Sequence, residues 1–226
     1  MTPNAPSAPN APDAPPPAAP PRDWPRLMLV WSPVAAPPLH ADWGGPPQPF
    51  AVIGAAVAAG LRLLQLRGRE LPGDARRIAA HTLRERFPEL VLLINDDALL
   101  ARELGCGLHL PEQAPLPAAW PPGAPWGRAV HGLAAARAAA AEGAHFLVVG
   151  TIFPTPSKPG HPGAGLELVT EVHAALRTPL YAIGGVDARS VPALRAAGAH
   201  GVAVQRAILD APDPAAATAA LLTSLG

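Results

Sequence analysis

The sequence predicts a single α/β domain folded as a (β/α)8 TIM barrel, with a disordered proline- and alanine-rich tail before it. Two observations favour this fold class: short apolar runs recur at a fairly steady spacing, and helical patterns lie between most of them. Several runs are continuously apolar, which is typical of strands buried on both faces of a parallel sheet. Eight such units close naturally into a barrel. An open doubly wound sheet shows the same alternation, and periodicity alone does not exclude it.

The expected elements follow in order along the chain. The strands are Leu27–Trp31, Leu61–Leu66, Val91–Ile94, Gly107–Leu110, Gly127–Val130, Phe146–Val149, Leu180–Ile183 and Gly201–Val204. The helices are Phe50–Ala59, Asp74–Arg86, Ala98–Leu104, Leu133–Glu142, Leu166–Leu176, Ser190–Ala197 and Asp213–Leu225. Several patterns end at a glycine, which favours a left-handed C-cap. The connection "PEQAPLPAAWPPGAP" is proline-rich and holds one short helical turn at most.

Residues 1–22 should form the tail and residues 23–226 the barrel domain. The tail is rich in proline and alanine, offers little apolar bulk to bury, and blocks both helix and strand pairing. Lysine and arginine together equal aspartate and glutamate at 17 each, so the chain has no basic excess for a nucleic-acid partner. No apolar stretch is long enough to cross a membrane. The single cysteine, Cys106, excludes an internal disulfide, favours a cytoplasmic location and is best interpreted as a buried structural thiol.

In a barrel of this kind the active site lies at the carboxyl ends of the strands. Gly184 and Gly185 follow the seventh expected strand, and Gln205 and Arg206 follow the eighth. Loops at these positions often bind phosphate, and glycine lets backbone N–H groups approach a ligand closely. The alternative is that the two glycines form only a tight turn.

Cations and one imidazole follow other strands. Arg67, Arg69 and Lys158 would place positive charge over the same mouth, which suits an anionic small molecule, although each alone could be solvated surface charge. His131 ends the fifth strand and can take and give a proton near neutral pH, or can be a structural residue. In "INDD", Asn95 or Asp96 could cap the next helix, or Asp96 could bind Mg²⁺.

Together these residues resemble the thiamine phosphate synthase/TenI superfamily of (β/α)8 barrels. The segments that carry the resemblance are "QLRGRE", "INDDALLARELG", "GLHLPE", "AVHGLAAA", "GTIFPTPSKPG", "YAIGGV" and "GVAVQRAI". One activity of the superfamily joins a pyrimidine methyl diphosphate to a thiazole phosphate. The resemblance implies that Gln65, Arg67, Asn95, Asp96, Thr155 and Lys158 would hold the diphosphate or its magnesium. The other activity is that of TenI-type thiazole tautomerases, which move a proton on a carboxythiazole phosphate.

Two departures make us favour the tautomerase. The synthase pattern has an aspartate where this chain has Ala114, and a serine where it has His131. The resemblance implies that His131 is the catalytic acid/base. We expect the substrate to be held by Arg67, Arg69, Asn95, Thr155, Lys158, Gly184, Gly185, Gln205 and Arg206. We therefore expect an isomerase of thiamine biosynthesis without metal or cofactor. The alternatives are a Mg²⁺-dependent synthase with Asp96 as metal ligand, or a non-catalytic ligand-binding barrel. The alanine-rich helices suit either a homo-oligomer or a monomer.

Overall fold

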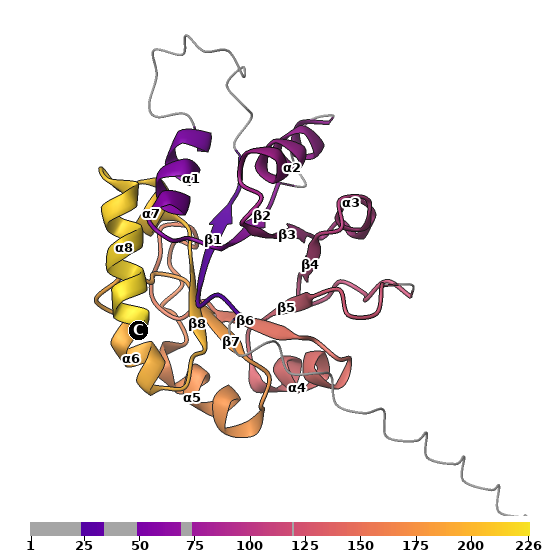
Figure 1. Ribbon diagram of the computed structural model, residues 1–226. Helices are drawn as coiled ribbons and strands as arrows, with labels where there is room; N and C mark the ends of the chain where they lie inside the picture. Colours follow the sequence, from indigo (N-terminus) through magenta and orange to yellow (C-terminus); the bar gives the residue numbers. More distant parts are fainter. Residues whose placement is uncertain (1–23, 34–48, 69–73, 119) are drawn as a thin grey trace, which may run out of the picture.

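The protein is a closed barrel of eight parallel strands with helices around it (Figure 1). The computed structural model describes residues 24–33, 49–68, 74–118 and 120–226. The expected tail, residues 1–22, lies outside the described residues and stays a prediction. The open doubly wound alternative is excluded because β1 pairs in parallel with both β2 and β8, which closes the ring. The predicted (β/α)8 barrel is confirmed.

The strands lie close to the expected positions. They are β1 Leu27–Trp31, β2 Leu63–Leu66, β3 Val91–Asn95, β4 Gly107–Leu110, β5 Trp126–Val130, β6 Phe146–Gly150, β7 Leu180–Ile183 and β8 Gly201–Val204. Each pairs with its neighbour in sequence, and the register runs evenly around the ring, for example Met28 opposite Leu63. The second strand starts two residues later than expected. The Leu61 amide donates instead to the Ala56 carbonyl at 3.0 Å and so belongs to the end of the preceding helix.

The helices pack on the outside of the sheet. They are α1 Pro49–Ala58, α2 Ala75–Arg86, α3 Ala98–Glu103, α4 Leu133–Ala141, α5 Gly165–Ala175, α6 Val191–Ala196, α7 Arg206–Leu209 and α8 Pro214–Leu225. The first and last, α1 and α8, lie side by side (Figure 1). The short helix α7 was not expected, because four residues are too few to show a periodicity. Between β4 and β5 the described residues form no helix, as the prolines predict.

Two separate apolar clusters build the core. One fills the space between strands and helices; the other fills the barrel interior and includes Met28, Leu63, Phe146 and Tyr181. The Phe146 ring fills the space beside Gly127 on the neighbouring strand. A Cβ at Gly127 would lie 2.4 Å from the ring, so only glycine fits there. The interior is therefore a packed core and not a channel, as in other barrels of this class.

Inward-facing side chains change from apolar to polar toward the carboxyl ends of the strands. Along β2, Leu63 belongs to the interior cluster, whereas Gln65 and Arg67 line a pocket above it. Along β3, Leu93 and Asn95 show the same change. Successive inward positions are two residues apart because side chains alternate across a strand. This gradient closes the bottom of the barrel with hydrocarbon and leaves hydrogen-bonding groups at its mouth.

Candidate active site

A pocket of about 690 Å³ opens at the carboxyl ends of the strands. Every described member of the predicted catalytic and substrate-binding set lines it: Arg67, Asn95, His131, Thr155, Lys158, Gly184, Gly185, Gln205 and Arg206. Asp96, the expected metal ligand of the synthase alternative, is not among the lining residues. Arg69 lies outside the described residues. Residues from six different strand ends thus meet in one cavity, as the barrel rule predicts. The roles assigned to them remain predictions, because the geometry brings the groups together without showing a ligand's position.

The turn after β7 depends on its two glycines. Gly184 and Gly185 have φ angles of +101° and +65°, a region that side chains with a Cβ rarely adopt. A Cβ at Gly185 would also lie 2.5 Å from the Pro154 carbonyl oxygen. The turn is therefore tight and packs directly on the loop after β6, while its backbone still faces the pocket. The two interpretations of these glycines, a turn and a ligand-contacting backbone, are compatible.

Two short-range contacts shape the mouth beside this turn. The Asp187 carboxylate accepts hydrogen bonds from the Arg189 side chain and from the Ser190 amide, and these lower the pKa of Asp187. On the other side, Arg206 pairs with Asp210 at 2.6 Å, four residues along. The Arg206 cation is thus partly balanced by an acidic neighbour that also lines the pocket.

His131 lies at the rim, held between Glu112 and Lys158. The Glu112 carboxylate accepts from the His131 backbone amide at 2.7 Å and contacts ring atom Nδ1 at 2.9 Å. Burial alone would raise the pKa of the Glu112 carboxyl, but the hydrogen bonds from His131 outweigh burial and lower it. The ionised carboxylate can only accept, so Nδ1 carries a proton. Nε2 then faces the Lys158 ammonium, 3.5 Å away, and can accept from it.

A second histidine, His109, lies deep in the pocket. Its ring atom Nδ1 is 3.1 Å from the Asn95 side-chain oxygen, an acceptor, so Nδ1 donates and Nε2 is left as an acceptor. Nε2 is buried and has no hydrogen-bond partner within the described residues. Burial, together with the nearby charges of Arg67 and Arg128, lowers the pKa of His109 to about 3. A neutral imidazole that lines the pocket therefore keeps one buried acceptor without a partner among the described residues.

This buried histidine predicts an acid sensitivity of the fold. An unfolded imidazole titrates near pH 6.5, so below that value the unfolded chain binds a proton that folded His109 refuses. The stabilisation is complete above about pH 6.5 and is lost as the pH falls toward 3. Between pH 7 and pH 5 this amounts to about 2 kcal/mol. Urea unfolding at pH 7 and pH 5 measures how much the free energy of unfolding falls between the two pH values. In His109→Gln this fall should be smaller than in the wild type by about 2 kcal/mol. Parallel pH dependence of variant and wild type would contradict the neutral state of His109.

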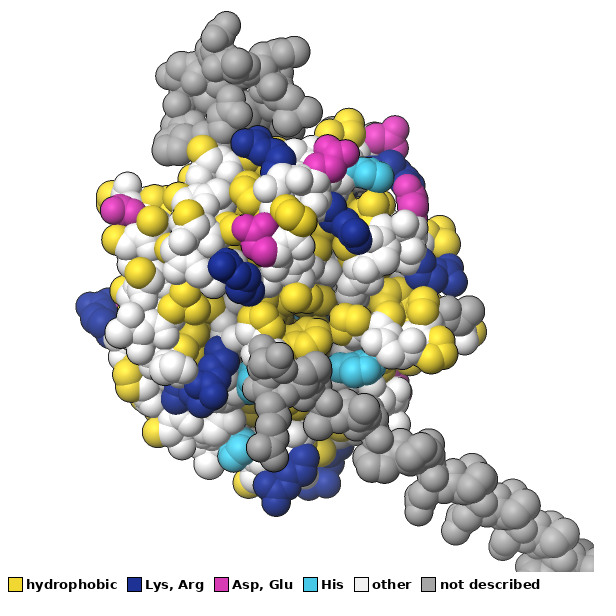
Figure 2. Space-filling model, in the orientation of Figure 1, with side chains coloured by type: hydrophobic (Ala, Val, Ile, Leu, Met, Phe, Trp, Pro, Cys, Tyr) yellow, Lys and Arg dark blue, Asp and Glu magenta, His cyan; other side chains and the backbone are white. Residues whose placement is uncertain are grey.

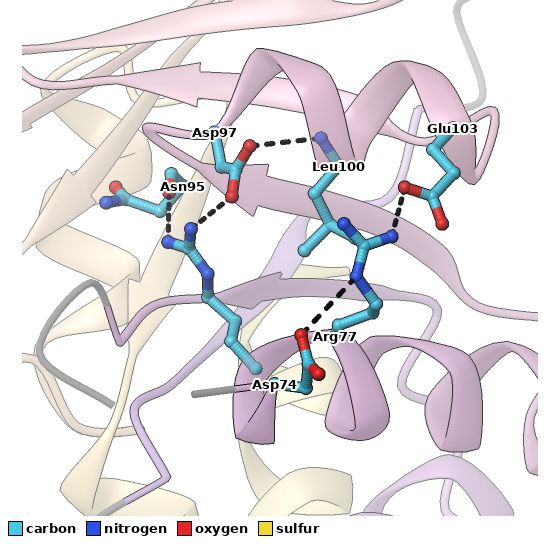
Figure 3. Close-up of polar contacts among 7 residues, drawn as sticks. Asp74, Arg77, Asn95, Asp97, Leu100 and Glu103 are labelled. Atoms are coloured by element: carbon cyan, nitrogen blue, oxygen red, sulfur yellow. Dashed lines mark hydrogen bonds and ion pairs between the residues drawn. The ribbon is translucent and has the colours of Figure 1, made fainter. Parts of the chain in front are cut away.

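The turn after β3 is fixed by Asp97, which neither of our two expectations named. Asp97 caps α3, its carboxylate accepting from the Leu100 amide at 3.0 Å, and it also pairs with Arg76 of α2 (Figure 3). Arg76 donates to the Asn95 carbonyl as well, at 3.3 Å. The expectation that Asn95 or Asp96 caps the helix is therefore wrong. Because α3 begins at Ala98, the capping position is Asp97, which leaves the Asn95 side chain for the pocket.

Asp96 adopts the left-handed conformation, with φ at +54°. Its amide donates to the His109 carbonyl at 2.9 Å, which ties the end of β3 to β4. Aspartate tolerates this conformation better than most residues with a Cβ, but it still carries a cost. A strained backbone beside a pocket is typical of a residue placed for function.

Cationic side chains do not form a continuous stripe on the face drawn in Figure 2, where they alternate with apolar and acidic groups. Within the pocket, Arg67 and Lys158 supply positive charge from β2 and from the loop after β6. Lys158 is the only lysine in the chain; the other 16 of the 17 cationic residues are arginines. None of the described helices has the length and apolar character needed to cross a bilayer.

Sequence reasoning assigned no role to Glu112, His109 or Arg128. Glu112 and His109 stand at strand ends and could have been included by position alone. Arg128 gave no such signal, because it lies in the middle of β5 and points away from the pocket. Ala129, the next residue on β5, lines the pocket, and so does His109, which pairs with Gly127. Side chains alternate along a strand, so Arg128 faces the other way. Its partners come from a loop whose path only the folded chain defines.

Comparison with known proteins decides the family. A family model described as thiamine monophosphate synthase matches residues 45–208, well over half of the chain. The chain belongs to this family. The resemblance of the quoted motifs to the superfamily is thereby confirmed over most of the barrel.

Curated relatives carry the same kind of name. A protein of Gloeobacter violaceus named thiamine-phosphate synthase is 38% identical over 209 residues, covering 88% of this chain and 57% of that protein. A thiamine-phosphate synthase of Mycolicibacterium gilvum is 42% identical over 180 residues, covering 72% of this chain and 76% of the relative. The chain thus spans little more than half the length of the first relative.

Solved structures agree on the fold. Thiamine phosphate pyrophosphorylase from Pyrococcus furiosus superposes with a TM-score of 0.73 at 23% identity, over 88% of this chain and 95% of that one. A 3-hexulose-6-phosphate synthase superposes with a TM-score of 0.64 at 19% identity, over 89% of this chain and all of the other. At these identities the likeness supports the barrel and nothing more.

The interpretation as a thiazole tautomerase, and therefore as an isomerase, was wrong. Relatives 38–42% identical to this chain are named as synthases, which are transferases. The absence of an aspartate at position 114 does not distinguish the two activities. Among the described residues Ala114 does not line the pocket, whereas Glu112 of the same loop does. That side of the pocket therefore keeps a carboxylate, and an imidazole paired with it is compatible with an anion site.

Proposed function

We propose that the barrel joins a pyrimidine methyl diphosphate to a thiazole phosphate and so makes thiamine phosphate, the product that the names of its relatives give for them. In this reaction the bond from the methylene carbon to the diphosphate oxygen breaks, and the electron pair leaves with the diphosphate. A bond forms between that carbon and the thiazole nitrogen. The observation that carries the proposal is that one pocket holds both a set of cationic and amide side chains and a glycine turn. Two anionic substrates need two such regions.

The glycine side suits the thiazole phosphate. Backbone N–H groups at Gly184, Gly185 and Gln205 lie where loops after the seventh and eighth strands of such barrels bind phosphate. Positive φ angles let two successive amides turn toward one anion. Arg206, already paired with Asp210, supplies a weaker charge there. This side needs only to bind a phosphate that does not react.

The cationic and amide side chains suit the diphosphate. Arg67, Asn95, Thr155 and Lys158 line the pocket at or after the ends of β2, β3 and β6, and Arg69, outside the described residues, is proposed to join them. Fixed cations stabilise negative charge more strongly in a transition state where that charge develops on the leaving oxygens. Arg67 follows β2 directly and Lys158 lies in the loop after β6, and the fold places both at the pocket. Cations that are already in place when the substrate binds need little reorganisation as the bond breaks.

Magnesium fits this donor set as an ion shared with the substrate. Asp96 is the proposed carboxylate, and Asn95 next to it lines the pocket. Within the described residues no three His, Cys, Asp or Glu side chains gather to cage a metal. Mg²⁺ commonly takes one or two carboxylates and completes its shell with phosphate oxygens and water. When bound, the ion would neutralise charge on the diphosphate.

The function is tested by incubating the full chain with both substrates and Mg²⁺. Thiamine phosphate and inorganic diphosphate should appear in equal amounts. Asp96→Asn should raise the Mg²⁺ concentration for half-maximal rate by about 10- to 100-fold, since a charge-assisted contact is lost. Asp74→Asn, a change at a side chain 82% exposed at the start of α2, is the matched control and should leave it unchanged. A folded protein that forms no product at saturating Mg²⁺ would refute the proposal.

A further inference from the structure

Arg128 is a buried cation outside the pocket. It lies on β5 and faces the helix layer, whereas the alternate residues Ala129 and His131 line the pocket. Only 5% of its side chain is exposed. A buried guanidinium is costly unless it is paired and hydrogen-bonded, so its partners show what it holds.

Those partners belong to the connection between β4 and β5. Nη1 donates to the carbonyls of Pro111 and Glu112, each at 3.2 Å, and to that of Ala114. Nη2 pairs with Glu142 at the end of α4, at 2.6 Å. The described part of every other connection between strands contains a helix, whose carbonyls accept from its own amides, but residues 111–118 and 120–125 form none. Arg128 supplies the donors that a helix would have supplied.

Glu112 links this clamp to the pocket. Its backbone carbonyl is held by Arg128 on the outside of the barrel, and its side chain reaches His131 on the inside. The His131 ring in turn faces the Lys158 ammonium. A continuous line of contacts therefore runs from a buried arginine in the helix layer to the only lysine of the chain.

We propose that Arg128 is a positioning residue: it fixes the β4–β5 loop so that Glu112 holds His131 against Lys158, and thereby sets the affinity for the diphosphate substrate. The inference rests on the proposed function for the identity of that substrate. The thiazole phosphate, on the Gly184–Gly185 side, should be indifferent to Arg128. A split between the two substrates is the signature of this role, because general loosening of the barrel would affect both.

The experiment compares Arg128→Lys with a matched control, Arg195→Lys. Arg195 also donates to loop carbonyls, those of Ala199 at 2.5 Å and His200 at 2.7 Å, but at the amino end of β8. Lysine keeps the charge and loses the planar fork in both variants. Both should lower the melting temperature. Arg128→Lys alone should raise KM for the pyrimidine diphosphate, by about tenfold, as supporting contacts commonly do. An equal rise in Arg195→Lys would overturn the proposal.

A double-mutant cycle tests the route through Glu112. In a Glu112→Ala background, Arg128→Lys should change KM for the diphosphate less than about twofold, because coupled residues are not additive. Full additivity would overturn the proposal. If Arg128→Lys fails to fold, Glu142→Gln removes one partner of the clamp at a half-exposed position and should give a smaller rise of about two- to threefold. An unchanged KM for the diphosphate in Glu142→Gln would also overturn the positioning role of Arg128.

Binding of inorganic diphosphate, measured by calorimetry, separates this inference from the proposed function. If the wild type binds diphosphate but couples nothing, the proposed function fails. The positioning role is then judged by diphosphate affinity alone, which should fall about tenfold in Arg128→Lys and stay unchanged in Arg195→Lys. Equal affinities in the wild type and Arg128→Lys would refute the positioning role whatever the chemistry.

Discussion

Replacing Lys158 with methionine should lower kcat/KM for coupling by about 10²- to 10³-fold, the cost of removing one preorganised group that meets developing charge. Lys158 lines the pocket, and its ammonium lies 3.5 Å from Nε2 of His131, which lines the same pocket. The effect should fall on both kcat and the KM for the diphosphate, because the leaving oxygens carry charge before the bond breaks and more charge after it.

Two further variants make this result specific. Lys158→Arg keeps the charge at a similar reach and should recover activity to within about tenfold of wild type. Arg137→Met removes an exposed cation from α4 and should change nothing. Because Lys158 is the only lysine, an amine-directed reagent can modify only it and the N-terminus, and inorganic diphosphate should protect it. A loss of less than threefold in Lys158→Met would exclude a role in charge stabilisation.

Gly185→Ala should destabilise the barrel by about 2–4 kcal/mol, the sum of a left-handed backbone with a Cβ and an overpacked contact. The new methyl group would meet the Pro154 carbonyl at 2.5 Å and the Phe153 Cβ at 2.8 Å, and neither belongs to a flexible side-chain end. The loop after β6 must then move, taking the glycine turn with it. The KM for the thiazole phosphate should rise by more than tenfold, since amide contacts to an anion depend steeply on distance.

Gly132→Ala is the matched control for this prediction. It also follows a strand, but its φ of −170° is extended and its Cβ would meet nothing within 4 Å. Chemical unfolding should show a loss below about 1 kcal/mol, the usual scale for such a change at a helix cap. If Gly185→Ala and Gly132→Ala lost the same free energy of unfolding, the turn after β7 would tolerate a side chain and the prediction would be wrong.

The fold was predictable because its signals are local. A strand buried on both faces is a continuous apolar run wherever it lies, and several of the helices between the runs end at glycines. The site was predictable as a set for a related reason: parallel strands bring all their carboxyl ends to one rim, so strand-end residues meet without any knowledge of contacts. The predicted reaction was wrong because it rested on two positions, Ala114 and His131. The other motifs of the chain resemble the synthases as well.

The sequence by itself determined the barrel, its rim and most of the residues there, since each depends on a pattern within a few neighbouring positions. Only the tertiary structure decided which of them touch. Asp97 and not Asp96 caps α3, Glu112 holds His131, and Arg128 clamps a loop 14 to 17 residues before it. Such pairings depend on which face of a strand a side chain takes and on the path of a loop without a helix. Both are fixed by ring closure and packing between elements, which no local pattern records.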